Sequence, residues 1–164
     1  MHLLTTPDLS ITDWNYFIEN FCETVIEINK EETRMTMTKL SEEGHYMYHQ
    51  QMRPGIPLVS NRSLIAEKYP IVDAGKDGIY MVISSSNQEA MHKKHADRMG
   101  KDVIAEIIVN MWHWKPTEDG KGTIIEHISS MNPNGSIPNM LIKQMAKKQG
   151  DAALQIANFL RARK

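Results

Sequence analysis

The apolar side chains in the last part of the chain recur at helical spacing. From Pro138 onward they fall mostly at intervals of three, four or seven residues, at Leu141, Met145, Ala152, Ile156 and either Phe159 or its neighbour Leu160. This pattern predicts one amphipathic helix of about 25 residues, about 40 Å long at about 1.5 Å per residue, with Ser136 as its N-cap. Gly150 weakens the middle of such a helix by up to about 1 kcal/mol relative to Ala, so we expect a bend there, or a break with Asp151 as a new cap.

Ahead of this helix, apolar and polar side chains alternate in short segments, as they do in strands. These segments predict three antiparallel pairs, namely 33–40 with 45–52, 63–72 with 78–84, and 102–114 with 123–130. Helical spacing predicts a further helix at 10–28, capped by Ser10, although its β-branched end at 24–28 could instead be a strand. The order of helix, about six strands and long helix predicts an α+β fold, in which a curved antiparallel sheet packs on the C-terminal helix.

Composition narrows the class of protein. The chain has 164 residues, of which 41% are hydrophobic, so we expect one domain over 1–164 that buries about 70% of its unfolded surface. Its net charge of −1 argues against a general nucleic-acid binder, and its single cysteine, Cys22, is typical of a reducing compartment. No segment has the roughly 18 apolar residues of a membrane span, and the start lacks signal-peptide features, so we expect a cytoplasmic protein.

Two separated motifs resemble those of one known family. Residues 132–145, NPNGSIPNMLIKQM, followed by ANFLR at 157–161, look like the closing turn and C-terminal lid helix of the steroidogenic-acute-regulatory-related lipid-transfer (START) domains. Residues 57–63, PLVSNRS, are similar to the family's Pro-[aliphatic]-x-x-Arg-Asp element, although Ser63 stands where Asp is usual. The resemblance covers 35–164 and implies a helix-grip (START/Bet v 1-like) fold with a hydrophobic tunnel between sheet and helix.

The same resemblance implies that the front of the family fold is missing. START domains usually carry a further helix and several strands before the matched region. Without them the sheet would be shortened and one end of the tunnel would be open. Either a removed segment or a partner chain, such as a second copy in a homo-oligomer, would then complete the sheet.

The resemblance also implies a function. It implies a protein that binds one hydrophobic lipid, such as a phospholipid or a sterol, for lipid transfer or sensing, without a cofactor and without catalysis. His49 and Lys68 fall where sterol-binding members have a tunnel Glu and its Arg partner, although both could instead face solvent. The side chains that we expect to contact lipid are His49, Lys68, Trp112, Trp114, His127, Met140, Leu141 and Met145. Arg62, beside a turn, we expect to be a structural ion-pair partner.

Positive charges predict a membrane-facing surface. Residues 143–164 carry six basic side chains and one acidic one, so an anionic surface should meet the C-terminal helix first. By the resemblance, 86–101 is a loop that gates the tunnel. We expect peripheral, transient docking on an anionic membrane through Met91, Lys93, Lys94, Arg98, Lys143 and Lys147, strengthened in mild acid by His92 and His95. The alternative is a solvated loop with no membrane role.

Candidate chemistry leaves two other functions open. His92 and His95 have a metal-chelating spacing, but Lys93, Lys94 and Arg98 repel cations, so we expect no metal site there. A polyketide cyclase-like enzyme on the same fold could use His49, His127 or Tyr48 as its acid or base. A regulatory or interaction module without a ligand is the third possibility.

Overall fold

Nine strands and three helices make up the part of the chain that the computed structural model describes, which is residues 1–29, 33–53, 59–85, 89, 93–94 and 100–164. The helices are α1 (Ile11–Glu19), α2 (Phe21–Ile28) and α5 (Asn139–Ala162), and a 3-10 turn, η1, spans Gly75–Asp77. The strands are β1 (His2–Thr6), β2 (Thr33–Lys39), β3 (Tyr46–Met52), β4 (Arg62–Lys68), β5 (Val72–Asp73), β6 (Ile79–Ser84), β7 (Val103–Ile104), β8 (Glu106–Pro116) and β9 (Thr123–Asn132).

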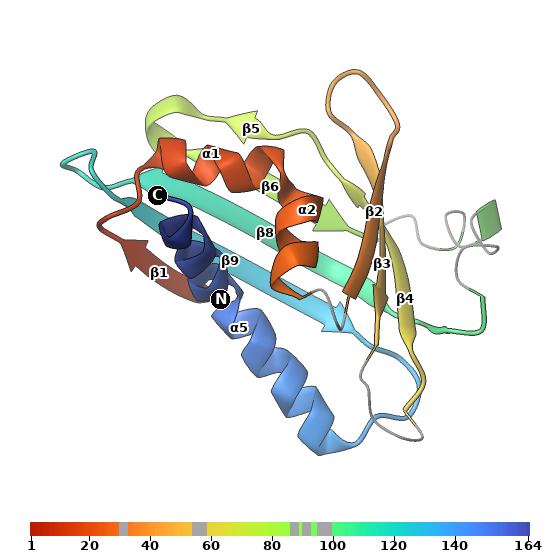
Figure 1. Ribbon diagram of the computed structural model, residues 1–164. Coiled ribbons are helices and arrows are strands. Elements are labelled where there is room, and N and C mark those ends of the chain that lie inside the picture. The colour runs from red at the N-terminus through yellow and green to blue at the C-terminus, as the bar shows by residue number, and fades with distance from the viewer. Residues whose placement is uncertain (30–32, 54–58, 86–88, 90–92, 95–99) are drawn as a thin grey trace.

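The strands form one curved sheet that grips the helices (Figure 1). Its order is β1-β9-β8-β6-β4-β3-β2, with β5 added to β6 and β7 added to β4. Every pair is antiparallel except β4 with β7. α1, α2 and α5 lie on the same side of the sheet, and α5 runs across β9 and β1 (Figure 1). The predicted α+β helix-grip architecture is confirmed.

Strand β1 was not predicted. It pairs with β9 from His2 opposite His127 to Thr6 opposite Thr123, and so occupies the edge of the sheet beside β9. Thr6 is the one buried residue of its five, so the strand shows no apolar alternation. The predicted strand 63–72 ends at Lys68, and the predicted strand 102–114 is divided between β7 and β8.

The predicted front helix is divided in two at Asn20. The Asn20 side-chain amide donates to the carbonyl of Tyr16 at 2.8 Å, which caps the end of α1 before α2 begins at Phe21. Ser10 is the N-cap of α1 as predicted, because its hydroxyl accepts from the Asp13 amide while the Asp13 carboxylate accepts from the Ser10 amide. Residues 24–28 are helical, so their strand alternative is wrong.

Helix α5 is continuous through Gly150, so the predicted break with Asp151 as a new cap is wrong. The glycine instead allows a close approach of β1, since a Cβ at this position would lie 2.7 Å from Cε1 of His2. The N-cap position belongs to Pro138 and not to Ser136. No helix within the described residues is both long enough and apolar enough to cross a membrane.

The core lies between the helices and the concave face of the sheet. Phe17 of α1 packs edge-on against Trp112 and Trp114 of β8, with ring centroids 5.7 and 6.0 Å apart. α5 contributes Ala153, Ile156, Ala157 and Leu160. Cys22 is buried in the same core, and burial raises the pKa of its thiol to about 12, which suits a structural thiol and not a nucleophile.

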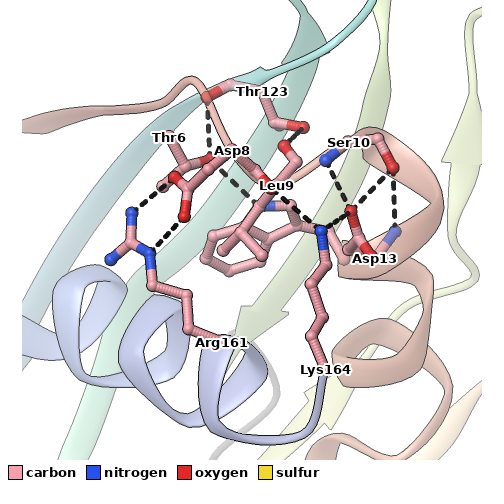
Figure 2. A network of polar contacts seen from close by, with 9 residues as sticks. Thr6, Asp8, Leu9, Ser10, Asp13, Thr123, Arg161 and Lys164 are labelled. Carbon is pink, nitrogen blue, oxygen red and sulfur yellow. Dashed lines mark hydrogen bonds and ion pairs between the residues drawn. The ribbon is translucent and has the colours of Figure 1, made fainter.

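The end of α5 is fastened to the segment between β1 and α1 (Figure 2). Arg161 holds the Asp8 carboxylate through Nε at 2.6 Å and Nη2 at 2.7 Å, and this hydrogen bonding lowers the pKa of Asp8 to about 2. Lys164 pairs with Asp13 at 3.0 Å. Next to them, the Thr6 hydroxyl donates to the Thr123 carbonyl, and the Thr123 hydroxyl donates to the Leu9 carbonyl. These contacts fix the C-terminal turns of the long helix.

Candidate functional site

A cavity of about 290 Å³ lies between the concave face of the sheet and the helices. This volume is near the lower end of the range of about 300–1,000 Å³ that is typical of ligand pockets. Apolar side chains from both layers dominate its wall: Phe17, Phe21, Val25 and Ile28 from α1 and α2, Met52, Leu64, Ile107, Trp112 and Met131 from the sheet, and Leu141, Met145 and Ile156 from α5. The cavity is therefore suited to an apolar ligand.

Strand geometry decides which side chains reach the cavity. Successive residues of a strand face opposite sides of a sheet, so Tyr48 and Gln50 of β3 line the cavity while Met47, the residue before Tyr48, packs with Ile65 on the other side. In β8, Ile107 and Asn110 both line the cavity although they are three positions apart, an odd spacing that puts residues of a regular strand on opposite sides of the sheet. A register shift between Ile107 and Val109 makes this possible, because a bulge reverses the alternation.

His127 and Trp112 form a stacked pair in the wall, with ring centroids 3.9 Å apart. Nε2 of His127 lies 3.0 Å from the amide oxygen of Asn110, to which it donates. Burial, together with the neighbouring positive charges of His2 and the N-terminal amine, lowers the pKa of His127 to about 4. The imidazole is therefore neutral at physiological pH, and the wall around it carries no charge from this residue.

In each of two further polar pairs in the wall, one side chain hydrogen-bonds to the other. The Tyr48 hydroxyl donates to the side-chain carbonyl of Gln50 at 2.7 Å, and burial raises the pKa of Tyr48. The Ser129 hydroxyl donates to the side-chain carbonyl of Gln149 at 3.3 Å. The indole N–H of Trp112, in contrast, has no hydrogen-bond partner among the described residues.

Arg62 lines one end of the cavity and is only 2% exposed. Its Nη1 donates to the Ser60 carbonyl and its Nη2 donates to the Asn134 carbonyl at 3.4 Å. Within the described part of the chain no carboxylate pairs with it, so the ion pair that we predicted is not found there. Sequence reasoning missed Arg62 as a cavity residue, and the available signal was Ser63, which stands where the family has a carboxylate.

Four of the predicted lipid contacts line the cavity, namely Trp112, His127, Leu141 and Met145. The other four lie elsewhere. His49 faces the opposite side of the sheet, where Nε2 is 2.8 Å from the Ser63 hydroxyl, and Met140 is 66% exposed on α5. Trp114 packs under Trp14 and Phe17.

Lys68, the remaining predicted contact, is 4% exposed, lies over the Tyr46 ring and has its pKa lowered by burial. His49 is also buried, at 8% exposed. The alternative that His49 and Lys68 face solvent is therefore wrong. Neither of them lines the cavity, so the basic end of the cavity is formed by other residues.

Of the predicted docking residues, Lys93, Lys94, Lys143 and Lys147 are exposed. Met91 and Arg98 lie outside the described residues, as do His92 and His95. Where the chain is described, no three His, Cys, Asp or Glu side chains are grouped so that they could hold a metal ion.

No family model and no curated protein sequence matches the chain. Solved structures with the same fold do. Human STARD10 superposes with a TM-score of 0.72 at 13% identity, over 96% of this chain and 61% of that one. The lipid transfer and protein localization domain of human StarD13 (DLC2) superposes with a TM-score of 0.68 at 14% identity, over 95% of this chain and 73% of that one. Human StAR-related lipid transfer protein 5 superposes with a TM-score of 0.62 at 9% identity, over 80% of this chain and 62% of that one.

These comparisons define the class of fold. The chain has the helix-grip fold of START domains, as its motifs predicted. It spans about three fifths of the length of the STARD10 chain. At these identities the likeness concerns the fold, and function has to be argued from the cavity.

Proposed function

We propose that the protein encloses one lipid molecule in the cavity between the sheet, α2 and α5, and carries or senses it without catalysing a reaction. The observation that carries this proposal is the mainly apolar wall of a cavity of about 290 Å³. Each Å² of apolar surface removed from water stabilises a complex by about 25 cal/mol. Two of the proteins with the same fold are named for lipid transfer.

The polar residues of the wall favour binding over catalysis. A general acid or base works best with a pKa near the working pH. The pKa of His127 is about 4, and burial raises that of Tyr48 above its ordinary value, so both move away from neutrality. His49, the third candidate for acid-base chemistry, faces the other side of the sheet. A cyclase-like reaction is therefore the weaker alternative.

Exchange of the lipid would take place at an anionic membrane, with the protein otherwise in the cytoplasm. Lys143 and Lys147 are exposed on the first half of α5, the same half that contributes Leu141 and Met145 to the cavity wall. Positive charge would thus lie beside the cavity, where a lipid has to enter. Residues 93–94 are drawn apart from α5 in Figure 1, so Lys93 and Lys94 would form a second, separate basic surface. A homo-oligomer that extends the sheet at β2, an edge strand, stays a prediction.

The test uses two substitutions on one helix. Met145→Asp would place a charge against the apolar wall and should abolish binding of a panel of NBD-labelled lipids, neutral and anionic. Met140→Asp, five residues earlier and on an exposed side chain, is the matched control and should bind normally. Extraction of the purified protein and mass spectrometry should identify a copurified lipid. Equal binding by both variants, or no binding by the wild type, would refute the proposal.

A further inference from the structure

The charged side chains in the wall of the cavity are all positive within the described part of the chain. They are Arg53, Arg62 and Lys148, and no Asp or Glu lines the cavity there. Apolar ligands do not need such residues. The positive charge of the wall therefore indicates a property of the ligand other than its apolar character.

Arg62 is the informative one because it is buried. A guanidinium carries five N–H donors, and a buried charge is costly unless it is paired. The contacts of Nη1 and Nη2 go to the backbone carbonyls of Ser60 and Asn134, which are neutral, and Nε has no partner among the described residues. Arg62 thus keeps its positive charge in the cavity wall without a carboxylate partner among the described residues, while its Nε is enclosed by protein atoms.

The sheet places a second arginine beside it. Met52 of β3 lies directly opposite Arg62 of β4, and Arg53 follows Met52. Both arginines are therefore at the same end of the β3–β4 pair, next to the turn that contains Asn134. This end of the cavity is cationic.

The aromatic part of the cavity lies further along the sheet. Tyr48 is opposite Ala66, which is four residues beyond Arg62 in β4, or about 13 Å at about 3.3 Å per residue. The ring of Phe21 lies 6.0 Å from that of Tyr48. The cavity therefore has a cationic end and an aromatic, apolar part, separated by a distance that an acyl chain can span.

Resting on the lipid binding proposed above, we propose that the ligand is an anionic amphiphile with one acyl chain, whose carboxylate or phosphate is held by Arg62. Arginine binds both groups through charge-assisted hydrogen bonds, which are stronger than the bonds that its terminal nitrogens make to the neutral carbonyls of Ser60 and Asn134. The chain of the ligand extends toward Phe21 and Trp112. A volume of about 290 Å³ favours one acyl chain over two.

Calorimetric titration of the wild-type protein with four ligands of one chain length tests the charge. Decanoate and decyl phosphate should bind at least about tenfold more tightly than decanol and methyl decanoate, given the usual strength of hydrogen bonds to charged groups. Equal or tighter binding of the neutral pair would overturn this inference and leave lipid binding intact. Binding of none of the four would instead count against the proposed function.

Substitution of Arg62 tests the residue. Arg62→Met should lose the preference for the anions over decanol, whereas Arg34→Met, which removes an exposed arginine of β2, should keep that preference. A preference that survives in a folded Arg62→Met protein would overturn the assignment. If circular dichroism shows that Arg62→Met is unfolded, Arg62→Lys is measured in its place. Arg62→Lys should weaken the preference for the anions, because an ammonium lacks the planar set of hydrogen-bond donors of a guanidinium.

Inorganic phosphate separates a lipid head group from a free anion. It should not displace decyl phosphate when both are present at the same concentration, because it lacks the chain that the apolar wall holds. Displacement under these conditions would assign the cationic end to a free anion and overturn the amphiphile.

Discussion

Gly150 allows a sharp test of how β1 and α5 pack. A Cβ at this position would lie 2.7 Å from Cε1 and 3.2 Å from Nδ1 of His2. Unbonded carbon atoms are at their best separation at about 3.5–4.0 Å. Gly150→Ala therefore forces the His2 ring to move.

Two opposing effects set the magnitude. Alanine in a helix interior is more favourable than glycine by about 0.8–1.0 kcal/mol. Moving the ring costs part of that gain, and the cost is limited because the His2 side chain is exposed. We expect Gly150→Ala alone to raise the free energy of unfolding by less than about 0.5 kcal/mol, and by about 0.8–1.0 kcal/mol when His2→Ala is already present.

Urea unfolding of the wild type, both single variants and the double variant measures this coupling. Lys147→Ala, at an exposed position of the same helix, combined with His2→Ala is the control and should be additive. If the changes in the free energy of unfolding caused by His2→Ala and Gly150→Ala also add to within about 0.3 kcal/mol, the close approach of β1 to α5 is refuted.

Two further predictions concern His127 and the basic surface of α5. Because the pKa of His127 is about 4 in the folded protein and 6.5 ordinarily, the unfolded chain binds the proton more readily between these values. The free energy of unfolding should therefore fall by on the order of 3 kcal/mol as the pH drops from about 6.5 to about 4. The urea midpoint of His127→Gln should fall less steeply over this range than that of the wild type. Parallel plots of urea midpoint against pH for the two proteins would contradict this prediction. The double variant Lys143→Gln/Lys147→Gln should bind phosphatidylserine vesicles about tenfold or more weakly than the wild type at low salt, as measured by sedimentation. The control pair Lys115→Gln/Lys121→Gln, also at exposed positions, should bind as the wild type does. Equal pelleting of the two double variants would contradict docking through α5.

Most of the architecture could be predicted because local patterns specify it. The apolar stripe of α5, the capping box at Ser10 and the alternation in β3 and β9 are readable within a few residues of one another. β1 could not be predicted in this way, since four of its five side chains are partly or fully exposed and its order comes from pairing with β9. Contacts between distant parts of a chain leave no local pattern.

The site was predictable only where one side of an element is clearly apolar. Leu141 and Met145 follow from the helical stripe. On β3 both sides carry polar residues, so the sequence does not specify whether Tyr48 or His49 faces the cavity, and packing under α2 decides for Tyr48. On β8 the bulge after Ile107 changes the phase of the alternation, and Asn110 could not be assigned to the cavity without it.

The two halves of α5 have different roles in this arrangement. The second half buries Ala153, Ile156, Ala157 and Leu160, and Arg161 and Lys164 tie its end to Asp8 and Asp13 (Figure 2). The first half has Leu141 as its one buried residue, although it also contributes Met145 and Lys148 to the cavity wall. Few apolar contacts and exposed turns are features of segments that open at low free-energy cost. We therefore expect the stability of the fold to depend mainly on the second half of α5, which Asp8 and Asp13 hold, and access to the cavity to depend on the first half.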